Sequence, residues 1–171
     1  MASQYRGLAE ALHVIHRYDL FRTLSDQGSK NRGFHGDIKP ENILFFNDKH
    51  SGGTGMGILQ LADFGLARYH HSTTIVEVSP RVTGHPYCPP EVDLTWKTDQ
   101  SLDIWTLGCL FLESLVWLMF GSQGLSEFQD DRRTEGIIGP ALQARPFYKV
   151  KERWGKASIH LNDGLVKVRC S

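Results

Sequence analysis

The sequence predicts an α+β domain that is mainly helical, with one small β-hairpin and a central buried helix. Three observations lead to this fold class: apolar residues recur at helical spacing near the start, two short apolar runs flank a glycine-rich stretch, and residues 101–120 are apolar on every side. With 171 residues, the chain has the size of one domain and can bury a core.

Composition excludes several classes of protein. Lys plus Arg equals Asp plus Glu at 19 each, so no basic excess indicates a nucleic-acid partner or an anionic membrane. The cysteines Cys88, Cys109 and Cys170 are odd in number and far apart, which argues against a disulfide framework or a zinc site. The N-terminus has no apolar core of a signal peptide. We therefore expect an intracellular protein, cytoplasmic or nuclear, with no signal peptide, transmembrane segment or membrane partner.

The first element is an amphipathic helix from about residue 4 to 17. Its apolar positions recur one turn apart at Leu8, Leu12 and Ile15. His13 and His16 also lie one turn apart, but no convincing third metal ligand is near them in the sequence. We interpret both as ordinary helix histidines. Residues 25–32 follow as a polar, exposed connection.

The next segment, His35–Asn42, carries side chains suited to phosphoryl transfer. Asp37 can accept a hydroxyl proton, Lys39 can place a cation against the transferring group, and Asn42 offers an amide oxygen to Mg²⁺. Pro40 fixes its φ and stiffens the loop. The same string taken alone is also typical of a solvated turn, so its context decides between the two interpretations.

That context begins with a predicted hairpin. Ile43–Phe46 and Ile58–Ala62 read as two strands, and the glycine-rich residues 47–57 between them read as a hairpin loop. A phosphate cradle there is less favoured, because no helix or lysine-bearing strand follows it. Asp63-Phe64-Gly65 comes after the second strand, and a carboxylate at a strand end is suited to holding Mg²⁺.

The most apolar stretch is Ser101–Phe120, which predicts a long helix. A helix apolar all round is either the centre of a globule or a membrane span. Glu113 in its middle, Asp103 at its start and a length slightly short of the ~20 apolar residues that a bilayer requires favour the globule.

Four segments in order resemble the C-terminal lobe of the eukaryotic protein kinases. They are His35–Asn42 (catalytic loop), Asp63–Gly65 (metal-binding D-F-G), Tyr87–Glu91 (end of the activation loop, with Pro89 where alanine is usual) and Ser101–Gly108 (start of the long helix). The resemblance covers about residues 5–121. Lys39, two residues after Asp37, is similar to the serine/threonine branch.

The resemblance implies a protein serine/threonine kinase that uses ATP and Mg²⁺ and acts on a protein substrate. Asp37 would be the catalytic base, Lys39 the phosphate contact, Asn42 and Asp63 the Mg²⁺ ligands, and Leu44 the floor of the adenine site. Asp103 would brace the catalytic loop from inside the lobe. The other residues with implied structural roles are His35, Phe64, Gly65 and Glu91. Residues 66–90 would form the activation loop, with candidate phosphorylation sites at Ser72, Thr73, Thr74, Ser79 and Thr83.

Two positions depart from the family pattern. Gly36 stands where arginine usually precedes the catalytic Asp, and that arginine pairs with activation-loop phosphate, so we expect independence from such a switch. Gly84 stands where a loop Thr is common, with Thr83 one place early. The arginine that would pair with Glu91 cannot be identified from the sequence.

The sequence also contains no nucleotide-covering Gly-rich loop followed by a lysine strand. We therefore expect residues 1–171 to be a single partial kinase domain without the N-terminal lobe, with little or no activity alone. Residues 122–171 read as divergent or incomplete: Gln129–Arg133 as a charged surface stretch, Arg145–Tyr148 as a helix breaker, and Ile159–Val168 as a hairpin.

Two alternatives remain open. Small-molecule phosphotransferases of the aminoglycoside and choline kinase type carry H-G-D-x-x-x-x-N, which His35, Gly36, Asp37 and Asn42 fit, although Lys39 and the two downstream segments do not. The second alternative is a pseudokinase, a binding module that keeps the fold and has lost the reaction.

Overall fold

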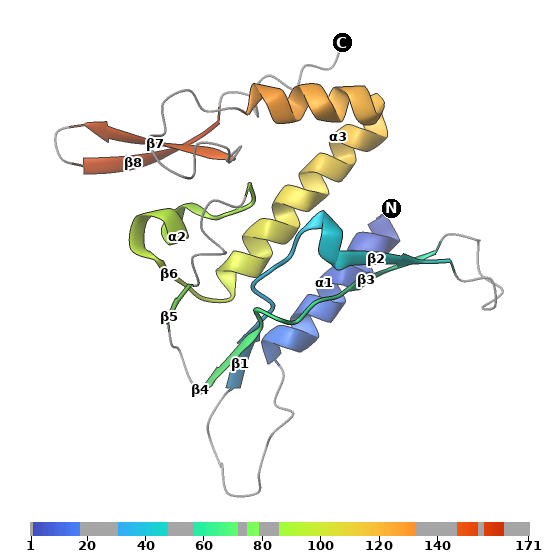
Figure 1. Ribbon diagram of the computed structural model, residues 1–171, viewed down its shortest axis with the longest axis horizontal. Helices are drawn as coiled ribbons and strands as arrows, with labels where there is room; N and C mark the ends of the chain where they lie inside the picture. The colour runs from blue at the N-terminus through green and yellow to red at the C-terminus, as the bar shows by residue number, and fades with distance from the viewer. Residues whose placement is uncertain are drawn as a thin grey trace, which may run out of the picture. The chain divides into compact units, whose positions relative to one another are not determined.

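The computed structural model describes residues 2–17, 31–47, 57–71, 75–78, 86–132, 147–153 and 156–162 (Figure 1). The chain divides into two compact units, Met1–Val76 with Asp99–Leu107, and Glu77–Thr98 with Gly108–Ser171. The elements that begin before residue 77 are α1 (Ala2–Arg17), β1 (Asn31–Phe34), η1 (Pro40–Asn42), β2 (Ile43–Phe46), β3 (Ile58–Leu61), β4 (Arg68–His71) and β5 (Val76–Glu77). The later elements are α2 (Pro90–Thr95), β6 (Lys97–Thr98), α3 (Ser101–Asp131), β7 (Tyr148–Arg153) and β8 (Lys156–Leu161).

Helix α1 forms where the apolar spacing predicts it. Leu8, Leu12 and Ile15 are buried, with exposed fractions of 0%, 4% and 8%. The helix packs against β1 and β3. Its polar Gln4 also contacts β3, because its side-chain oxygen accepts a hydrogen bond from the Leu59 N–H at 3.0 Å and its amide nitrogen donates to the Gly57 carbonyl just before that strand.

Strands β2 and β3 form the predicted antiparallel hairpin. The register pairs Ile43 with Leu61 and Phe46 with Ile58. The hairpin is confirmed by this pairing, while the loop at 48–56 lies outside the described residues. The register brings the start of β2 and the end of β3 together, which is the edge at which Asn42 and Asp63 lie.

A second antiparallel pair, β1 with β4, was not predicted. Asn31 pairs with His71 and Phe34 with Arg68. The predicted polar connection over residues 25–32 is therefore wrong at its end, because Asn31 and Arg32 belong to β1. Four residues without an alternating apolar pattern give no local strand signal, and a partner 34 to 40 positions downstream supplies the hydrogen bonds.

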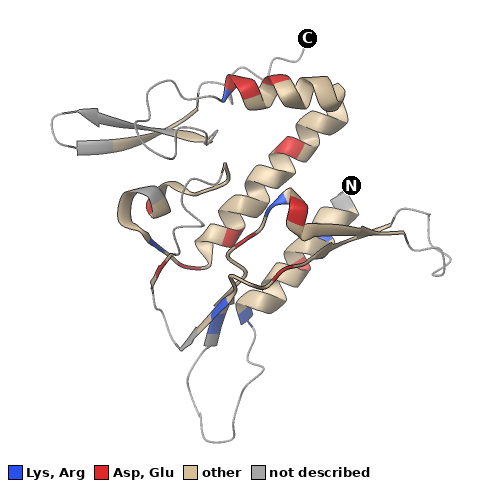
Figure 2. Cartoon of the chain, in the orientation of Figure 1, with Lys and Arg blue, Asp and Glu red and all other residues tan. Residues whose placement is uncertain are grey.

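Helix α3 is longer and less buried than predicted. It runs to Asp131 and is kinked at Gly121, whose φ of 71° is not helical. The prediction of a central buried helix holds in part: Leu102, Leu110 and Val116 are buried, whereas Trp117 is 47% exposed and Met119 62% exposed. Figure 2 shows long uncharged stretches between isolated acidic positions of α3. By length and composition alone α3 could also cross a membrane, and 28% of its most apolar window is buried.

The C-terminal strands form a pair that was not predicted. Ile159 and Leu161 belong to β8, which pairs with the preceding β7 in a register that opposes Tyr148 to Leu161 and Arg153 to Lys156. The predicted hairpin at 159–168 stays a prediction, because its second half, residues 163–168, lies outside the described part of the chain. The charged stretch at 129–133 is also not all surface, since Arg132 is 1% exposed.

Candidate active site

The second residue of the loop at 35–42 is a glycine in a left-handed conformation. Gly36 has φ +78°, and a Cβ built there would lie 2.9 Å from the Leu66 carbonyl oxygen and 3.2 Å from the Phe34 ring. Left-handed backbone is unfavourable for residues with a Cβ. Gly36, which the sequence marks as a departure from the family, therefore also suits the local shape of this loop.

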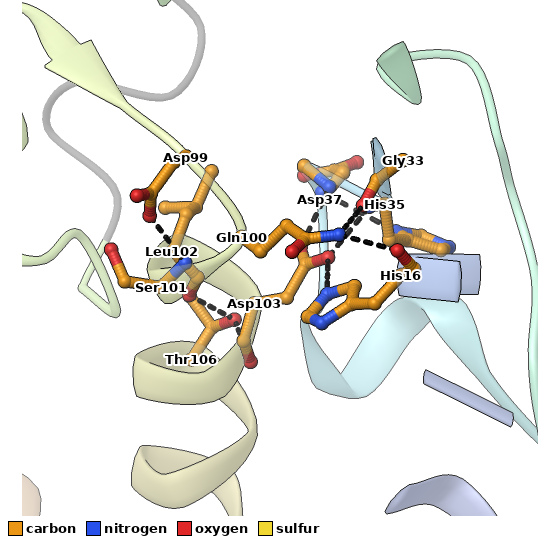
Figure 3. Close-up of polar contacts among 11 residues, drawn as sticks. His16, Gly33, His35, Asp37, Asp99, Gln100, Ser101, Leu102, Asp103 and Thr106 are labelled. Atoms are coloured by element: carbon orange, nitrogen blue, oxygen red, sulfur yellow. Dashed lines mark hydrogen bonds and ion pairs between the residues drawn. The ribbon is translucent and has the colours of Figure 1, made fainter. Parts of the chain in front are cut away.

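The buried carboxylate of Asp103 holds the start of the loop in place (Figure 3). Asp103 is 0% exposed. Its Oδ2 accepts the His35 N–H at 2.7 Å and its Oδ1 accepts the Gly36 N–H at 2.9 Å. A buried charge is stable only when it is paired and hydrogen-bonded, and these two backbone donors satisfy one oxygen each. The loop thus takes its position from the first turn of α3.

Helix α1 adds a third contact to the same carboxylate. His16 Nε2 lies 2.9 Å from Asp103 Oδ2, and the Gln100 amide nitrogen donates to the His16 carbonyl at 2.7 Å and to the Gly33 carbonyl at 2.9 Å. The sequence interpretation of His16 as an ordinary helix histidine missed this role. The available signal was helical phase, since His16 follows the buried Leu12 by four positions.

Asp99 lies two residues before α3 and contacts the first residue of that helix. Its Oδ1 accepts the Ser101 N–H at 2.7 Å, and this hydrogen bond lowers the pKa of the Asp99 carboxyl. A carboxylate before a helix satisfies a backbone donor that has no partner within the helix.

His35 links the loop at 35–42 to the end of β3. Its ring is fully buried, with Nε2 3.1 Å from the Ala62 carbonyl and Nδ1 accepting the Asp37 N–H at 3.3 Å. These partners fit a neutral ring that is protonated on Nε2, because a carbonyl can only accept. The Phe64 ring lies 4.8 Å from the His35 ring, centroid to centroid.

Asp37, Lys39 and Asn42 form one polar cluster. The Lys39 ammonium donates to Asp37 Oδ2 at 2.7 Å. The Asn42 amide nitrogen donates to the same oxygen at 2.8 Å and to the Asp37 carbonyl at 2.8 Å. The Lys39 and Asp37 side chains are 27% and 19% exposed, so solvent can reach them. Because the amide nitrogen of Asn42 faces Asp37, its oxygen is the atom that remains for a cation.

Asp63 lies at the same edge of the β2–β3 hairpin as Asn42. The Ala62 N–H donates to the Asn42 carbonyl at 2.8 Å, and Asp63 follows in a left-handed conformation with φ 59°. Its Oδ1 accepts the Gly65 N–H at 3.0 Å, and a Cβ at Gly65 would crowd that oxygen at 2.9 Å. This contact orients the exposed carboxylate.

The donor set fits Mg²⁺ that is also bound to phosphate oxygens. Mg²⁺ prefers hard oxygen ligands and usually takes one or two side chains together with substrate phosphates and waters. Asp63 offers a carboxylate and Asn42 an amide oxygen at one edge. Within the described ranges no three His, Cys, Asp or Glu side chains cluster into a metal site.

For the other residues predicted at the site, the structure shows fewer contacts or does not describe the residue. Leu44 is 45% exposed on β2, opposite Gln60, and presents apolar surface. Glu91 is half-buried in α2 of the second unit, where its carbonyl accepts the Thr95 hydroxyl at 2.7 Å. The candidate phosphorylation sites Ser72, Thr73, Thr74, Ser79 and Thr83, with Gly84, lie outside the described residues.

Comparison with known proteins gives a consistent answer. The family described as "Protein kinase domain" matches residues 10–161. The chain is 38% identical over 139 residues to the probable serine/threonine-protein kinase dyrk2 of Dictyostelium discoideum, covering 81% of this chain and 14% of the relative. It is 42% identical over 89 residues to the serine/threonine-protein kinase cds1 of Schizosaccharomyces pombe, covering 48% of this chain and 17% of that protein.

A third relative is the extracellular signal-regulated kinase 1 of D. discoideum, 35% identical over 99 residues, which are 57% of this chain and 17% of the relative. The chain thus spans less than a fifth of the length of these relatives. Its mixed helix and strand content is that of a protein-kinase-like fold, and the match to 10–161 extends beyond residue 121, where the sequence resemblance ends. The chain belongs to the protein kinase family.

Proposed function

We propose that the chain is the catalytic part of a protein serine/threonine kinase that transfers the γ-phosphoryl group of ATP to a protein hydroxyl. The observation that carries this proposal is the cluster at Asp37, whose Oδ2 receives both the Lys39 ammonium and the Asn42 amide at the edge where Asp63 also lies. Family membership and the names of the relatives support a kinase that acts on serine or threonine.

Each residue of the cluster has a chemical role in this proposal. Asp37 orients the substrate hydroxyl and accepts its proton, while Lys39 stabilises negative charge on the transferring group. The Asn42 oxygen and Asp63 would hold Mg²⁺, which neutralises phosphate charge when bound. Leu44 would support the adenine ring with its exposed apolar surface.

The nucleotide is contacted from one side in this proposal. The 171 residues include no Gly-rich loop followed by a lysine strand, so these residues act as a C-terminal lobe. We expect transfer by the 171 residues alone to be slow or absent, and to increase when an N-terminal kinase lobe is joined ahead of Met1.

A substrate screen tests the proposed class. The chain with an added N-terminal lobe is incubated with labelled ATP, Mg²⁺ and either a mixed protein substrate, an aminoglycoside or choline. Label on protein serine or threonine alone supports the proposal, whereas label on the small molecules would favour the H-G-D phosphotransferases. Label on neither, together with a melting temperature that Mg²⁺-ATP leaves unchanged, would favour a pseudokinase, because a ligand bound by the native state raises that temperature.

A further inference from the structure

The second unit contains a buried polar network that the proposed chemistry does not use. Its centre is Glu113, a carboxylate in the middle of α3 that is 6% exposed. The Tyr87 hydroxyl donates to Glu113 Oε2 at 2.6 Å, and Arg132 Nη2 donates to Glu113 Oε1. Gln129 adds a weaker contact to Oε1 at 3.4 Å. Both carboxylate oxygens are thus occupied by charged or strongly polar donors.

Arg132 is the most buried member of the network. Its side chain is 1% exposed, and the guanidinium carbon lies 3.9 Å from the centre of the Phe147 ring and 4.7 Å from that of Phe128. Its Nε and Nη1 atoms make no hydrogen bond with any residue that the structure describes. Burial lowers the pKa of Arg132 and Glu113 opposes that shift. Because a guanidinium stays protonated in proteins, Glu113 is the main partner that compensates its charge.

The β7–β8 hairpin holds Arg132 from the other side. The Asn162 amide nitrogen donates to the Arg132 carbonyl at 3.0 Å, and the Asn162 N–H donates to the Phe147 carbonyl at 3.1 Å. Phe147 and Asn162 flank the open end of the hairpin and are 3% and 1% exposed. The hairpin therefore supplies an aromatic face and a hydrogen-bond donor to one arginine.

Tyr87 connects the network to the segment that precedes α2. Its ring is 6% exposed and lies 6.0 Å from the Phe147 ring. The residues after it, Cys88, Pro89 and Pro90, are buried, and the Val92 N–H donates to the Pro89 carbonyl at 3.1 Å. A displacement of the Tyr87 ring would disturb this short, tightly packed segment.

We infer that Arg132 is a positioning residue through which the β7–β8 hairpin fixes residues 86–92. Asn162, next to the hairpin, donates a hydrogen bond to Arg132. Arg132 in turn donates to Glu113, and Glu113 accepts the Tyr87 hydroxyl. That residues 86–92 form part of a protein-substrate platform rests on the proposed kinase function. The coupling itself is a property of the second unit and requires no nucleotide, so it can fail or succeed independently of the kinase assay.

Hydrogen exchange on the full chain, without nucleotide, tests the coupling. Arg132→Met removes the charge and the guanidinium N–H donors but keeps a long apolar side chain. Arg132→Lys keeps the positive charge and loses the planar guanidinium. In residues 86–92 the backbone N–H groups belong to Tyr87, Cys88, Glu91 and Val92. We expect Arg132→Met to accelerate exchange of these amides by about tenfold or more, and Arg132→Lys to do so less, because exchange reports local opening. Carbon-13 labelling of the tyrosine Cζ atoms should show the Tyr87 signal moving in both variants.

A control separates positioning from simple loss of stability. Leu12→Ala removes buried apolar volume from α1 in the first unit and should lower stability without selectively accelerating exchange in residues 86–92. Equal acceleration in Leu12→Ala, or an unchanged Tyr87 signal in Arg132→Met, would overturn the inference. If Arg132→Met does not fold, Asn162→Ala decides instead: it releases the hairpin from Arg132 and should accelerate the same amides, and a rate equal to wild type would contradict the coupling.

Enzyme kinetics test separately whether residues 86–92 serve as a protein-substrate platform. In the chain with an added N-terminal lobe, Arg132→Lys should raise the KM for the protein substrate by about threefold or more while leaving the KM for ATP unchanged. A proportional change in both values would contradict a specific effect on the substrate platform. Absence of any kinase activity would contradict the proposed function and leave the exchange result standing.

Discussion

Asp103 and His35 are joined by a buried hydrogen bond of 2.7 Å between the carboxylate Oδ2 and the backbone N–H. The two residues lie 68 positions apart in the chain. The bond ties the first turn of α3 to the first residue of the loop at 35–42, so the position of Asp37 depends on a side chain outside the polar cluster around Asp37.

Replacing Asp103 should lower the free energy of unfolding. Asp103→Ala leaves the backbone N–H groups of His35 and Gly36 buried without an acceptor, and each such loss costs roughly 1–3 kcal/mol. We expect the free energy of unfolding in urea, followed by tryptophan fluorescence, to fall by about 3 kcal/mol or more. Glu10→Ala is the control, since Glu10 forms an exposed ion pair with Arg6 and such surface pairs contribute little to stability. Similar values for the two variants would refute the bracing role.

Alanine substitutions at Gly36 and Gly7 should change stability in opposite directions. Gly36→Ala places a Cβ 2.9 Å from the Leu66 carbonyl at a positive φ, so we expect a loss of about 1–2 kcal/mol or more. Gly7→Ala lies in α1 where a Cβ meets no atom within 4 Å, and it should gain about 0.5–1 kcal/mol because alanine favours the helix. Urea unfolding of both variants checks this. Equal tolerance at the two positions would show that the loop does not require the left-handed conformation.

The buried thiol of Cys109 should be unreactive in the native chain. Burial raises the pKa of Cys109 to about 12, and only the thiolate is nucleophilic. At pH 8.5 we expect iodoacetamide to label Cys109 slowly in buffer and rapidly in urea, as measured by peptide mass spectrometry. Because the folded pKa is raised, the contribution of this group to stability is present below the unfolded pKa of about 8.5 and is lost as pH rises toward about 12. Rapid labelling in buffer would contradict the buried placement.

The carboxylate of Asp99, two residues before α3, should stabilise the fold above acid pH. Asp99→Ala removes the acceptor of the Ser101 N–H, which should cost about 0.5–2 kcal/mol. The pKa of Asp99 is lowered in the folded chain, so its contribution is present above the unfolded pKa and is lost as pH falls through the folded one. Asp99→Asn should keep much of the stability but lose this part of the pH dependence. Identical acid titration curves for wild type and Asp99→Asn would refute the assignment.

The sequence predicts those parts of the fold that local patterns determine. Leu8, Leu12 and Ile15 share a helical phase, and the runs at 43–46 and 58–61 are bounded by turn residues, so α1 and the β2–β3 hairpin follow from the residues themselves. The order of Asp37, Lys39, Asn42 and Asp63 likewise indicates the cluster that the fold assembles at one edge of that hairpin.

The features that the sequence does not predict depend on residues that lie far away in the chain. Strand β1 gains its hydrogen bonds from β4, and nothing in Asn31–Phe34 indicates this. Arg132 lies in a charged stretch, yet two aromatic rings and Glu113 stabilise it in the interior. His16 acts through Asp103, 87 positions away. Composition and periodicity report local preference, whereas these residues are placed by tertiary contacts.

Phosphate transfer that depends on Asp37 tests the central claim most directly. The chain joined to an N-terminal kinase lobe is given labelled ATP, Mg²⁺ and a protein substrate, and its rate is compared with that of Asp37→Asn, which keeps the shape of the side chain and removes its charge. We predict Mg²⁺-dependent phosphoserine or phosphothreonine in the substrate, and a rate lower by about 10²–10⁴-fold in the variant. Equal rates for the two proteins would contradict the assignment of Asp37, and no transfer by either would contradict the proposed kinase.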